Sequence, residues 1–554
     1  MFGLSGPTFL GIVLSLAASA QEGEAVRDVT RQKAIRYLDL TDEQVAAGML
    51  DSGIKEAEVE KRPYREYVAE CVDLLMQHGT DRYGRIHTPM LVNILDVRTR
   101  ECPELPDIAR WPWRGDNRTC FWKPRGADLF IDQSTIEVMY LLSQLTGRDA
   151  YKQFADRYLR YAMNLTDEKG FFWWGWHRFY DVFDDVKCFS HGKNHEIHIN
   201  RPRWEEMWKI DELAVKKEIE LIWQWHVIDK KTGEFNRHGN GQQGCDFAMS
   251  GGEFVYAFSF LYGKTRDETY LKAAKLVADY HWRNRNPRTS LVPNRPNAGT
   301  DRFDGSHFDT SISGLLGYYL LKSYELLGVQ EFRDQALSYL RAYAKYGYDA
   351  QTGKFWGSLR LDGTPVPGPR LSEGYAQYEP RGHIDLWEPY QLGYEYPIYT
   401  AQAYAYAYQL TGQKDMLAAA RKWADCIRSS PPTTGCNKNA YYKWYAEHFA
   451  PLGTFAGMYG RSISFFVHMY ALTGDDLYLR DARRFANQAI SKLYYQGLFR
   501  GHPAKPYYCA VDGVGFLLYG LLQLDRVLAC PDSLRQAKAI PLGPEPATIT
   551  FDNW

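Results

Sequence analysis

The residues of this chain that could do chemistry are concentrated in three short segments. The first is "FFWWGWHRFYD" (171–181), the second is "HGKNHEIHINRPRW" (191–204) and the third is "WQWHVIDKKTGEFNRHGNG" (223–241). Their candidate metal ligands and anion-binding residues include His177, Arg178, His195, Glu196, His198, Arg201, Arg237 and His238. Imidazole nitrogens and carboxylate oxygens bind metals, and guanidinium groups bind carboxylates. The segments therefore suggest a metal or anion site assembled from distant parts of the chain.

The pattern HEIH at residues 195–198 does not fit the helical zinc site of metalloproteases. That site needs two histidines four residues apart, so that both rings lie on one helix face. Here the histidines are three apart, and Asn200 and Pro202 follow directly. Glu196 is therefore interpreted as one part of a larger site. We expect His195 and His198 to orient the ligands or to have a structural role.

A set drawn from all three segments has a clearer meaning. His177, Glu196 and His238 would supply two imidazoles and one carboxylate. Such mixed ligands suit Mn²⁺, Zn²⁺, Ni²⁺ or Co²⁺, and they suit Ca²⁺ less well because Ca²⁺ prefers oxygen atoms alone. Three protein ligands leave coordination positions open for water or a substrate oxygen. Non-haem iron oxygenases use a similar set, but usually on a β-barrel, and this chain has a helical pattern.

Composition excludes some partners and favours others. The formal net charge is -1 and charged residues make up 24% of the chain, so neither nucleic acid nor an acidic membrane is expected as a partner. Aromatic residues make up 15%, with 16 Trp and 40 Tyr, and such rings suit ligands that are half apolar and half polar, such as sugars. The nine cysteines form no CxxC pair, which argues against a zinc ribbon or a thioredoxin-like site.

An export signal is predicted at the N-terminus. An apolar run from Phe9 to Leu16 leads into Ala18, Ser19 and Ala20, a small-x-small cleavage pattern, and the run is too short to span a bilayer. We predict a signal peptide over residues 1–20, one catalytic domain over 21–535 and a C-terminal tail over 536–554. The mature protein is then expected to be secreted or periplasmic, to make no membrane contact and to be a monomer.

A weak repeat predicts the fold. Each copy has an aromatic-rich helix, a glycine-containing turn and a second helix with apolar residues at three- and four-residue spacing. The copies cover residues 138–163, 254–282, 320–347, 403–427 and 465–490. The turn glycine fits a helix C-cap, where φ is positive. Repeated helical hairpins form an open solenoid or a closed α/α toroid. The uneven spacing of the copies favours an all-α toroid whose long loops gather at one mouth and build the site.

The order and spacing of four landmarks resemble one known family. "WWGWHRF", "HEIHINRPRWEEMW", "WQWHV" and "NRHGNG" are together similar to polysaccharide lyase family 2, the metal-dependent pectate lyases with an (α/α)7 barrel. The resemblance extends more loosely to residues 382–397 and 494–514, and residues 294–314 and 363–381 depart from the family pattern. It implies β-elimination of polygalacturonate (pectate) or a related 4-linked uronan, with a divalent metal, Mn²⁺ favoured, as cofactor.

The same resemblance assigns roles to four residues. It implies that His177, Glu196 and His238 bind the metal and that Arg237 is the base. The metal would act as a Lewis acid on the uronate carboxylate next to the carbon that loses its proton. A guanidinium has an ordinary pKa above roughly 12, so it can act as a base only where nearby positive charge and a dry site lower that pKa. The alternative role for Arg237 is to clamp a substrate carboxylate.

Further residues are candidates for substrate binding. Arg178 and Arg201 could hold neighbouring uronates, or they could form surface ion pairs. Trp176 and Trp204 could stack on sugar rings, or they could belong to the core. His383, Arg500 and His502 lie in loops between the predicted hairpins, where they could contact the substrate.

Two other functions remain open at this point. The first is a hydrolase or epimerase on an α/α toroid, which would need no metal and could use Asp385 and Glu388, or Asp301 and Asp304. The second is a noncatalytic glycan-binding protein, which would keep the aromatic residues but has no use for an Arg-His pair beside further metal ligands.

Overall fold

The computed structural model describes most of the chain between residues 49 and 529. The described residues are 26–29, 49–103, 125–175, 177–189, 192–197, 202–297, 305–369, 379–387, 395–433, 453–529, 543–545 and 548–550. The predicted signal peptide and most of the predicted C-terminal tail lie outside these residues, so both stay predictions. None of the helices in the described part of the chain combines the length and the apolar character that crossing a membrane requires.

Long helices make up most of the described structure. The α-helices are α2 (Tyr64–Leu74), α3 (Leu129–Thr146), α4 (Asp149–Asn164), α5 (Trp204–Ile210), α6 (Glu212–Trp225), α7 (Ala248–Thr265), α8 (Glu268–Arg283), α9 (Gly317–Leu327), α10 (Gln330–Tyr346), α11 (Pro397–Thr411), α12 (Lys414–Ser429), α14 (Ala456–Thr473), α15 (Asp476–Leu493) and α16 (Val514–Ala529). Short 3₁₀ and π-helical turns cover Glu56–Lys61, Leu75–Gly79, Ile312–Leu316 and Ala510–Asp512.

The strands are short, with two to four residues each. They are β1 (Val26–Asp28), β2 (Ile94–Asp96), β3 (Gly126–Ala127), β4 (Arg178–Asp181), β5 (Val186–Phe189), β6 (Phe308–Asp309), β7 (Tyr348–Asp349), β8 (Lys354–Phe355), β9 (Ser358–Leu359), β10 (Tyr494–Tyr495), β11 (Leu498–Phe499), β12 (Tyr507–Cys509), β13 (Gly543–Glu545) and β14 (Thr548–Thr550). The largest sheet has the order β1-β5-β4-β3, and the others have two strands each. In the largest sheet, β4 and β5 form a hairpin in which Arg178 is opposite Phe189.

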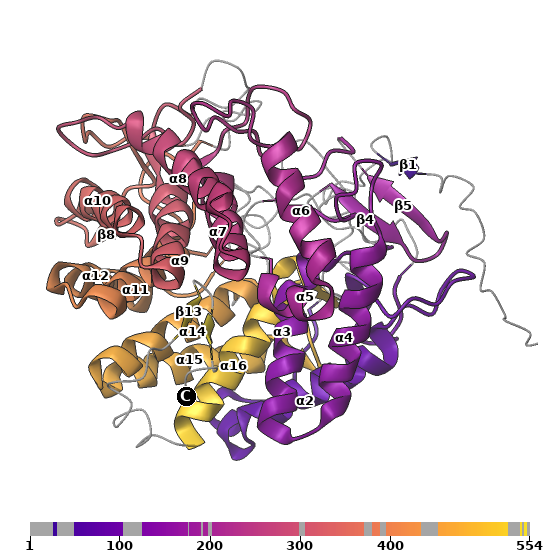
Figure 1. Ribbon diagram of the computed structural model, residues 1–554. Coiled ribbons are helices and arrows are strands. Elements are labelled where there is room, and N and C mark those ends of the chain that lie inside the picture. The colour runs from indigo at the N-terminus through magenta and orange to yellow at the C-terminus, as the bar shows by residue number, and fades with distance from the viewer. Residues whose placement is uncertain are drawn as a thin grey trace, which may run out of the picture.

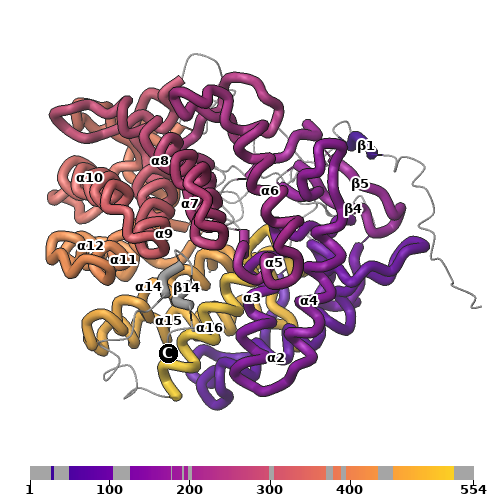
Figure 2. The backbone as a smooth tube through the Cα atoms, viewed as in Figure 1, coloured from indigo at the N-terminus to yellow at the C-terminus, as the bar shows by residue number. Residues whose placement is uncertain are grey.

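The helices pack in pairs that follow one another around a ring. The seven pairs in the described part of the chain are α2 with α16, α3 with α4, α5 with α6, α7 with α8, α9 with α10, α11 with α12, and α14 with α15. The ring closes because α16 packs against α3, which brings the two ends of the helical domain together. Figure 2 shows this closure, since the yellow C-terminal helix lies beside the indigo and purple N-terminal helices. The predicted all-α toroid is confirmed.

The ring has an inner and an outer layer of helices, and the two layers differ in their pattern of buried residues. In α11, residues 397–407 are all buried, because this helix is covered on every side. Its partner α12 buries residues at three- and four-residue spacing, such as Met416, Ala420 and Trp423, and exposes the opposite face. This amphipathic pattern is typical of an outer helix. In Figure 1, α10 and α12 accordingly lie at the outer left edge, with α9 and α11 inside them.

The topology places the long loops at one end of the ring. Five of the pairs are joined by two-residue turns, at 147–148, 266–267, 328–329, 412–413 and 474–475. In four of these turns a glycine is the left-handed C-cap, as predicted, but in the second repeat Gly263 lies inside α7 and Arg266 is the cap, with a φ of 60°. Paired helices run antiparallel, so the connections between pairs, including 165–203 and 226–247, all emerge at the opposite end.

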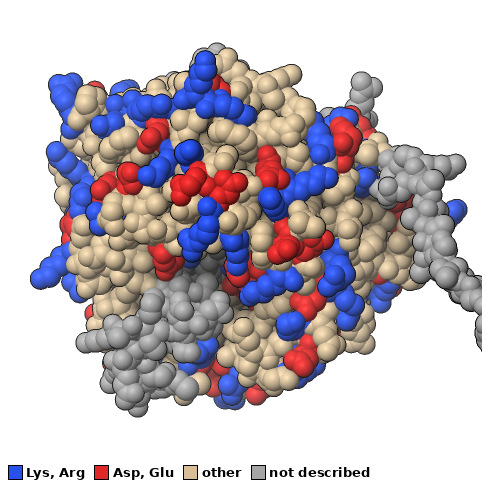
Figure 3. Space-filling model, in the orientation of Figure 1, with Lys and Arg blue, Asp and Glu red and all other residues tan. Residues whose placement is uncertain are grey.

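The surface agrees with the balanced composition. On the face shown in Figure 3, basic and acidic side chains are interspersed, as expected for a formal net charge of -1. The buried apolar residues form one cluster that runs through all the helix pairs, together with one small cluster beneath β4 and β5. The described helical domain therefore has a single core.

Candidate metal centre

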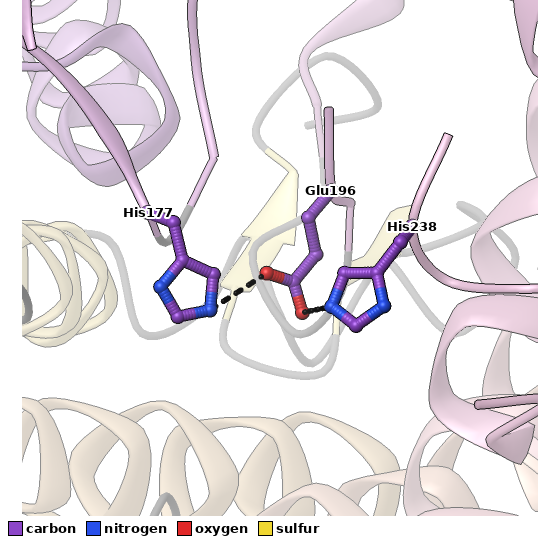
Figure 4. Close-up of side chains that lie close together, drawn as sticks. All are labelled: His177, Glu196 and His238. Atoms are coloured by element: carbon purple, nitrogen blue, oxygen red, sulfur yellow. Dashed lines mark ion pairs between the residues drawn. The ribbon is translucent and has the colours of Figure 1, made fainter. Parts of the chain in front are cut away.

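Three side chains from two long connections converge on one point. The Nε2 atom of His177 lies 3.2 Å from Oε2 of Glu196, and the Nε2 atom of His238 lies 3.6 Å from Oε1 of the same carboxylate. One ligand atom from each of the three residues lies within 4.8 Å of the other two. Figure 4 shows Glu196 between the two imidazoles. The structure thus brings together the three residues that the sequence suggested as metal ligands.

The donor chemistry of this cluster fits a divalent metal ion. Ligand atoms about 2.1 Å from a common ion lie roughly 3–3.5 Å from one another in tetrahedral or octahedral geometry. The two imidazole–carboxylate separations of 3.2 Å and 3.6 Å are close to this range. Glu196 is 1% exposed and His177 is 8% exposed. Water therefore has little access to the carboxylate of Glu196 and cannot solvate its negative charge. A metal ion bound by His177, Glu196 and His238 would stabilise that buried negative charge.

The backbone fixes the distances within the cluster. His177 directly precedes β4, and the β4–β5 hairpin turns the chain back so that residues 192–197 return towards it. Glu196 and His238 face each other in an isolated antiparallel bridge. The amide of Gly239 donates to the carbonyl of His195 over 2.8 Å, next to that bridge. Two segments far apart in sequence are therefore joined through main-chain contacts at the residues that carry the ligands.

Gly175 allows the first segment to approach the second. Its φ is +120°, and a Cβ atom at this position would lie 2.7 Å from the carbonyl oxygen of Glu196. Both observations make any side chain larger than that of glycine unfavourable here. A glycine is therefore required at this position of "WWGWH", because the main chain at Glu196 lies where a side chain would be.

We expect Gly175→Ala to weaken Mn²⁺ binding and to lower the free energy of unfolding by about 1–3 kcal/mol, because strain of this kind costs about that much. Urea unfolding and Mn²⁺ titration measure the two effects. The matched control is Gly147→Ala, at a C-cap with φ +70° and no atom within 4 Å of the added Cβ. The control should lose stability without losing Mn²⁺ affinity. Equal Mn²⁺ affinity in both variants would contradict this role of Gly175.

Arg237 lies against the carboxylate of the cluster. Its Nε atom is 3.0 Å from Oε1 of Glu196, and the residue is 8% exposed. Its guanidinium carbon lies 4.8 Å from the centre of the Phe247 ring, and its amide donates to the carbonyl of Cys245. The guanidinium is therefore held beside the candidate ligands, where it could act on a substrate bound to the same metal.

A buried acid lies behind the cluster. Glu218, on α6, is fully buried, and its Oε2 atom accepts a hydrogen bond of 2.8 Å from the amide of Phe172. Burial raises the pKa of the Glu218 carboxyl to about 8, although hydrogen bonds from Phe172 and Trp174 act in the opposite direction. Its side chain is therefore protonated at neutral pH in the folded protein.

This raised pKa predicts a pH-dependent stability. An unfolded glutamate titrates near about 4.3, so between that pH and about 8 the folded state keeps a proton that the unfolded state has released. Rising pH then destabilises the wild type through Glu218, and Glu218→Gln removes this contribution. We expect the unfolding free energy of Glu218→Gln, relative to the wild type, to increase from about pH 5 to pH 8 and then to level off. Chemical unfolding of the metal-free proteins at several pH values measures it, and a difference independent of pH would contradict the prediction.

Two of the predicted substrate contacts are instead engaged inside the protein. Arg178 is buried, forms an ion pair of 2.7 Å with Asp167 and donates to the carbonyl of Lys193 over 2.8 Å. It therefore joins the hairpin to the segment that carries Glu196. Trp204 is buried and packs edge-on against Trp174 with 5.9 Å between ring centres, so it belongs to the core.

The three candidates from later loops also have partners within the protein. Arg500 is buried and donates to the carbonyls of Leu50 and Pro503 over 2.6 Å and 2.8 Å. His502 is buried against the ring of Phe455. His383 stacks on Trp356 and lies 2.9 Å from a carboxylate oxygen of Asp349. These contacts hold the three side chains against other parts of the protein.

Some sequence candidates fall outside the described residues. They are Trp176, His198, Arg201, Asp301, Asp304 and Glu388. Asp385 is described, and its amide donates to a carboxylate oxygen of Glu395 over 3.3 Å. Two buried residues near the cluster, Glu218 and His226, were not predicted from the sequence. Only the folded chain shows that their polar groups lie next to the segments with Glu196 and His238.

Residues 125–249 match the model of the family described as periplasmic pectate lyase. This segment begins just before α3 and ends at the start of α7, so it contains His177, Glu196, Arg237 and His238.

Three solved structures show a weaker likeness over most of the chain. A cellobiose 2-epimerase from Bacillus thermoamylovorans is 10% identical with a TM-score of 0.44, covering 84% of this chain and 99% of its own. An α-1,6-mannanase of Salegentibacter sp. in complex with α-1,6-mannotriose is 11% identical with a TM-score of 0.42, covering 84% and 99%. An unsaturated glucuronyl hydrolase specific for heparin is 11% identical with a TM-score of 0.42, covering 84% and 98%. With TM-scores below 0.5, the assignment of the fold rests on the helix pairing described above.

The family match covers the same part of the chain as the landmarks "WWGWHRF" and "NRHGNG". It supports the assignment of this protein to the carbohydrate-active enzymes that act on polysaccharides. Over residues 125–249, the chain thus matches the periplasmic pectate lyase family, which confirms the resemblance seen in the sequence.

Proposed function

We propose that this protein is a metal-dependent lyase that cleaves polygalacturonate, or a related 4-linked uronan, by β-elimination. The observation that carries the proposal is the position of Arg237 3.0 Å from Glu196, beside the imidazoles of His177 and His238. A metal-binding carboxylate and a guanidinium then face the same space, as removal of a proton next to a carboxylate requires. The family match over residues 125–249 supports the same reaction.

His177, Glu196 and His238 are the residues that would hold the metal. Two imidazoles and one carboxylate suit Mn²⁺, Ni²⁺, Co²⁺ or Zn²⁺, and suit Ca²⁺ less well. The family resemblance favours Mn²⁺ among these ions. When bound, the metal would supply a Lewis acid for the carboxylate of the uronate. The low exposure of Glu196 and Arg237 keeps water away from the side chains that face the substrate, so that their charges act through a medium of low dielectric constant.

Arg237 is assigned the role of the base. In its neutral guanidine form, the Arg237 side chain accepts the proton from carbon 5 of the uronate and becomes a guanidinium, which later returns that proton to the solvent. The electron pair of that C–H bond forms the double bond between carbons 4 and 5, and the bond from carbon 4 to the bridging oxygen breaks. The leaving oxygen then takes a proton from the solvent. The products are one saturated fragment and one fragment with an unsaturated uronate at its new end.

The proposed substrate suits the proposed location. An exported enzyme of this kind would act as a monomer on anionic polysaccharides or oligosaccharides in the periplasm or outside the cell. The export prediction rests on the apolar run and the cleavage pattern within residues 1–20. The description of the matched family as periplasmic supports it.

Ultraviolet absorbance tests the proposal. The purified protein is incubated with polygalacturonate and Mn²⁺, with and without EDTA, while unsaturated product and new reducing ends are both measured. Unsaturated product that appears only without EDTA supports the proposal. New reducing ends without absorbance, unaffected by EDTA, would show a hydrolase instead. Binding of the polysaccharide without any product would indicate a glycan-binding protein.

A further inference from the structure

A row of buried polar side chains lies behind the metal centre. Glu218, His195 and His226 are each fully buried. The Nε2 atom of His195 lies 2.8 Å from Oε1 of Glu218, and its Nδ1 atom lies 2.8 Å from Nε2 of His226. The Nδ1 atom of His226 in turn lies 2.8 Å from the carbonyl oxygen of Asn236. These groups form a continuous hydrogen-bonded chain from α6 to the segment with Arg237 and His238.

The carbonyl at the end of this chain determines the direction of its hydrogen bonds. A carbonyl oxygen only accepts, so Nδ1 of His226 carries the proton and donates to Asn236. The indole nitrogen of Trp174 lies 2.7 Å from Nε2 of His195 and can only donate, so Nε2 of His195 accepts and its Nδ1 carries the proton. Nδ1 of His195 therefore donates to Nε2 of His226. Oε1 of Glu218 lies 2.8 Å from the accepting Nε2 of His195.

Main-chain hydrogen bonds connect the same residues. The amide of Asn236 donates to the carbonyl of His226 over 2.8 Å. His226 therefore bonds both main-chain polar groups of Asn236, the amide and the carbonyl. The amide of Gly239 donates to the carbonyl of His195. A Cβ atom on Gly239 would lie 2.8 Å from Nε2 of His226, and the ring of Phe171 stacks on His195 with 4.1 Å between centres. The hydrogen-bonded row of Glu218, His195 and His226 is thus enclosed, and these side chains have little room to move.

Two members of this hydrogen-bonded chain are adjacent in sequence to residues of the metal centre. His195 directly precedes Glu196, and Asn236 directly precedes Arg237 and His238. We propose that His226 and Glu218 are positioning residues that fix Glu196 relative to the Arg237–His238 pair. This inference rests on the proposed metal centre. Its physical basis is that a ligand held at the right distance before the metal arrives loses little freedom on binding.

The first test replaces His226 by phenylalanine, which keeps an aromatic ring for the contacts with Phe171 and Phe254 but removes both hydrogen bonds. Mn²⁺ titration should give a dissociation constant about 10–100-fold weaker than the wild type, the usual effect of losing a partner that orients a metal ligand. The matched control is His468→Phe, a buried imidazole on α14 that pairs with Gln409. The control should lose stability but keep its Mn²⁺ affinity within about threefold, an effect below 1 kcal/mol.

The second test uses the other end of the chain and does not depend on the folding of the His226 variant. Glu218→Gln keeps a donor for His195 and an acceptor for Phe172, so its Mn²⁺ affinity should stay within about threefold of the wild type. Glu218→Leu removes both groups and should weaken Mn²⁺ binding by about 10-fold or more. Circular dichroism and thermal unfolding of the metal-free proteins show that each variant is folded.

The outcomes separate this inference from the proposed function. A folded His226→Phe or Glu218→Leu protein with wild-type Mn²⁺ affinity would overturn the positioning role alone, because the wild type would still bind the metal. Equal losses in Glu218→Gln and Glu218→Leu would also overturn it, since the hydrogen bonds would not be the cause. Absence of Mn²⁺ binding by the wild type would overturn the metal centre and this inference with it.

Discussion

Arg237→Ala is expected to lower kcat on polygalacturonate by about 10³-fold, within the range of roughly 10² to 10⁴ for loss of a general base. KM should change by less than about threefold, because the proton is transferred only in the transition state. Mn²⁺ affinity should be nearly unchanged, since His177, Glu196 and His238 remain. Steady-state kinetics at saturating Mn²⁺ and a separate Mn²⁺ titration measure these quantities.

The comparison with Arg237→Lys separates a base from a carboxylate clamp. Lysine keeps the positive charge and can also accept a proton when it is deprotonated, so a base role predicts partial activity with a shifted pH–rate profile. A clamp role predicts that Arg237→Ala raises KM and leaves kcat nearly intact. The second result would contradict the assignment of Arg237 as the base, although it would leave the metal centre in place.

Glu196→Gln is expected to remove most of the metal affinity and with it the activity. The Mn²⁺ dissociation constant should increase by more than about 100-fold, beyond the usual effect of losing only an orienting partner. Activity should fall to the level seen with EDTA, because Glu196 is the one carboxylate of the described cluster. The metal-free protein should also lose up to about 3 kcal/mol of stability, since Arg237 would lose its buried charge partner.

A matched control shows whether the effect is specific to the metal centre. Asp512→Asn breaks another buried ion pair, in which Lys505 lies 2.8 Å from the carboxylate. It should cost similar stability and leave Mn²⁺ affinity unchanged. If Glu196→Gln binds Mn²⁺ as tightly as the wild type, Glu196 is not a ligand and the metal centre must be assigned to other residues.

Much of the fold could be predicted from the sequence because its signals are local. Each repeat contains two amphipathic or apolar helices and a turn within about thirty residues, and the left-handed caps at Gly147, Gly328, Gly412 and Gly474 follow that pattern. The exception is Arg266, which occupies the same left-handed conformation without being a glycine. Arg266 is exposed at this turn, and its amide still donates to the carbonyl of Tyr262, so the cap hydrogen bond forms without a glycine.

The candidate ligands could be suggested from the sequence for a different reason. His177, Glu196 and His238 stand in short segments rich in glycine and aromatic residues, and the order of these segments resembles a known family. The structure brings the three side chains together, while their role as ligands stays a prediction. Gly175 shows how closely the segments fit, because its missing side chain leaves space for Glu196.

The roles of the other polar residues depend on contacts that sequence spacing does not show. Arg500 donates to Leu50, which is 450 positions away in the chain, and only the folded structure shows that its guanidinium is occupied there. Glu218 is one of several glutamates on an amphipathic helix, yet its pKa is raised because its side chain points into the core. Burial of a polar group is a property of the assembled ring, so neither role could be predicted from the sequence.

The most direct measurement of the central claim is mass spectrometry of the fragments released from a defined oligogalacturonide by the Mn²⁺-loaded protein. β-Elimination predicts pairs of fragments in which one is lighter than a saturated oligomer by one water molecule. These fragments should be absent after EDTA treatment and strongly reduced in Arg237→Ala. Pairs in which both fragments are saturated would contradict the account, because the bond would then have been cleaved by water.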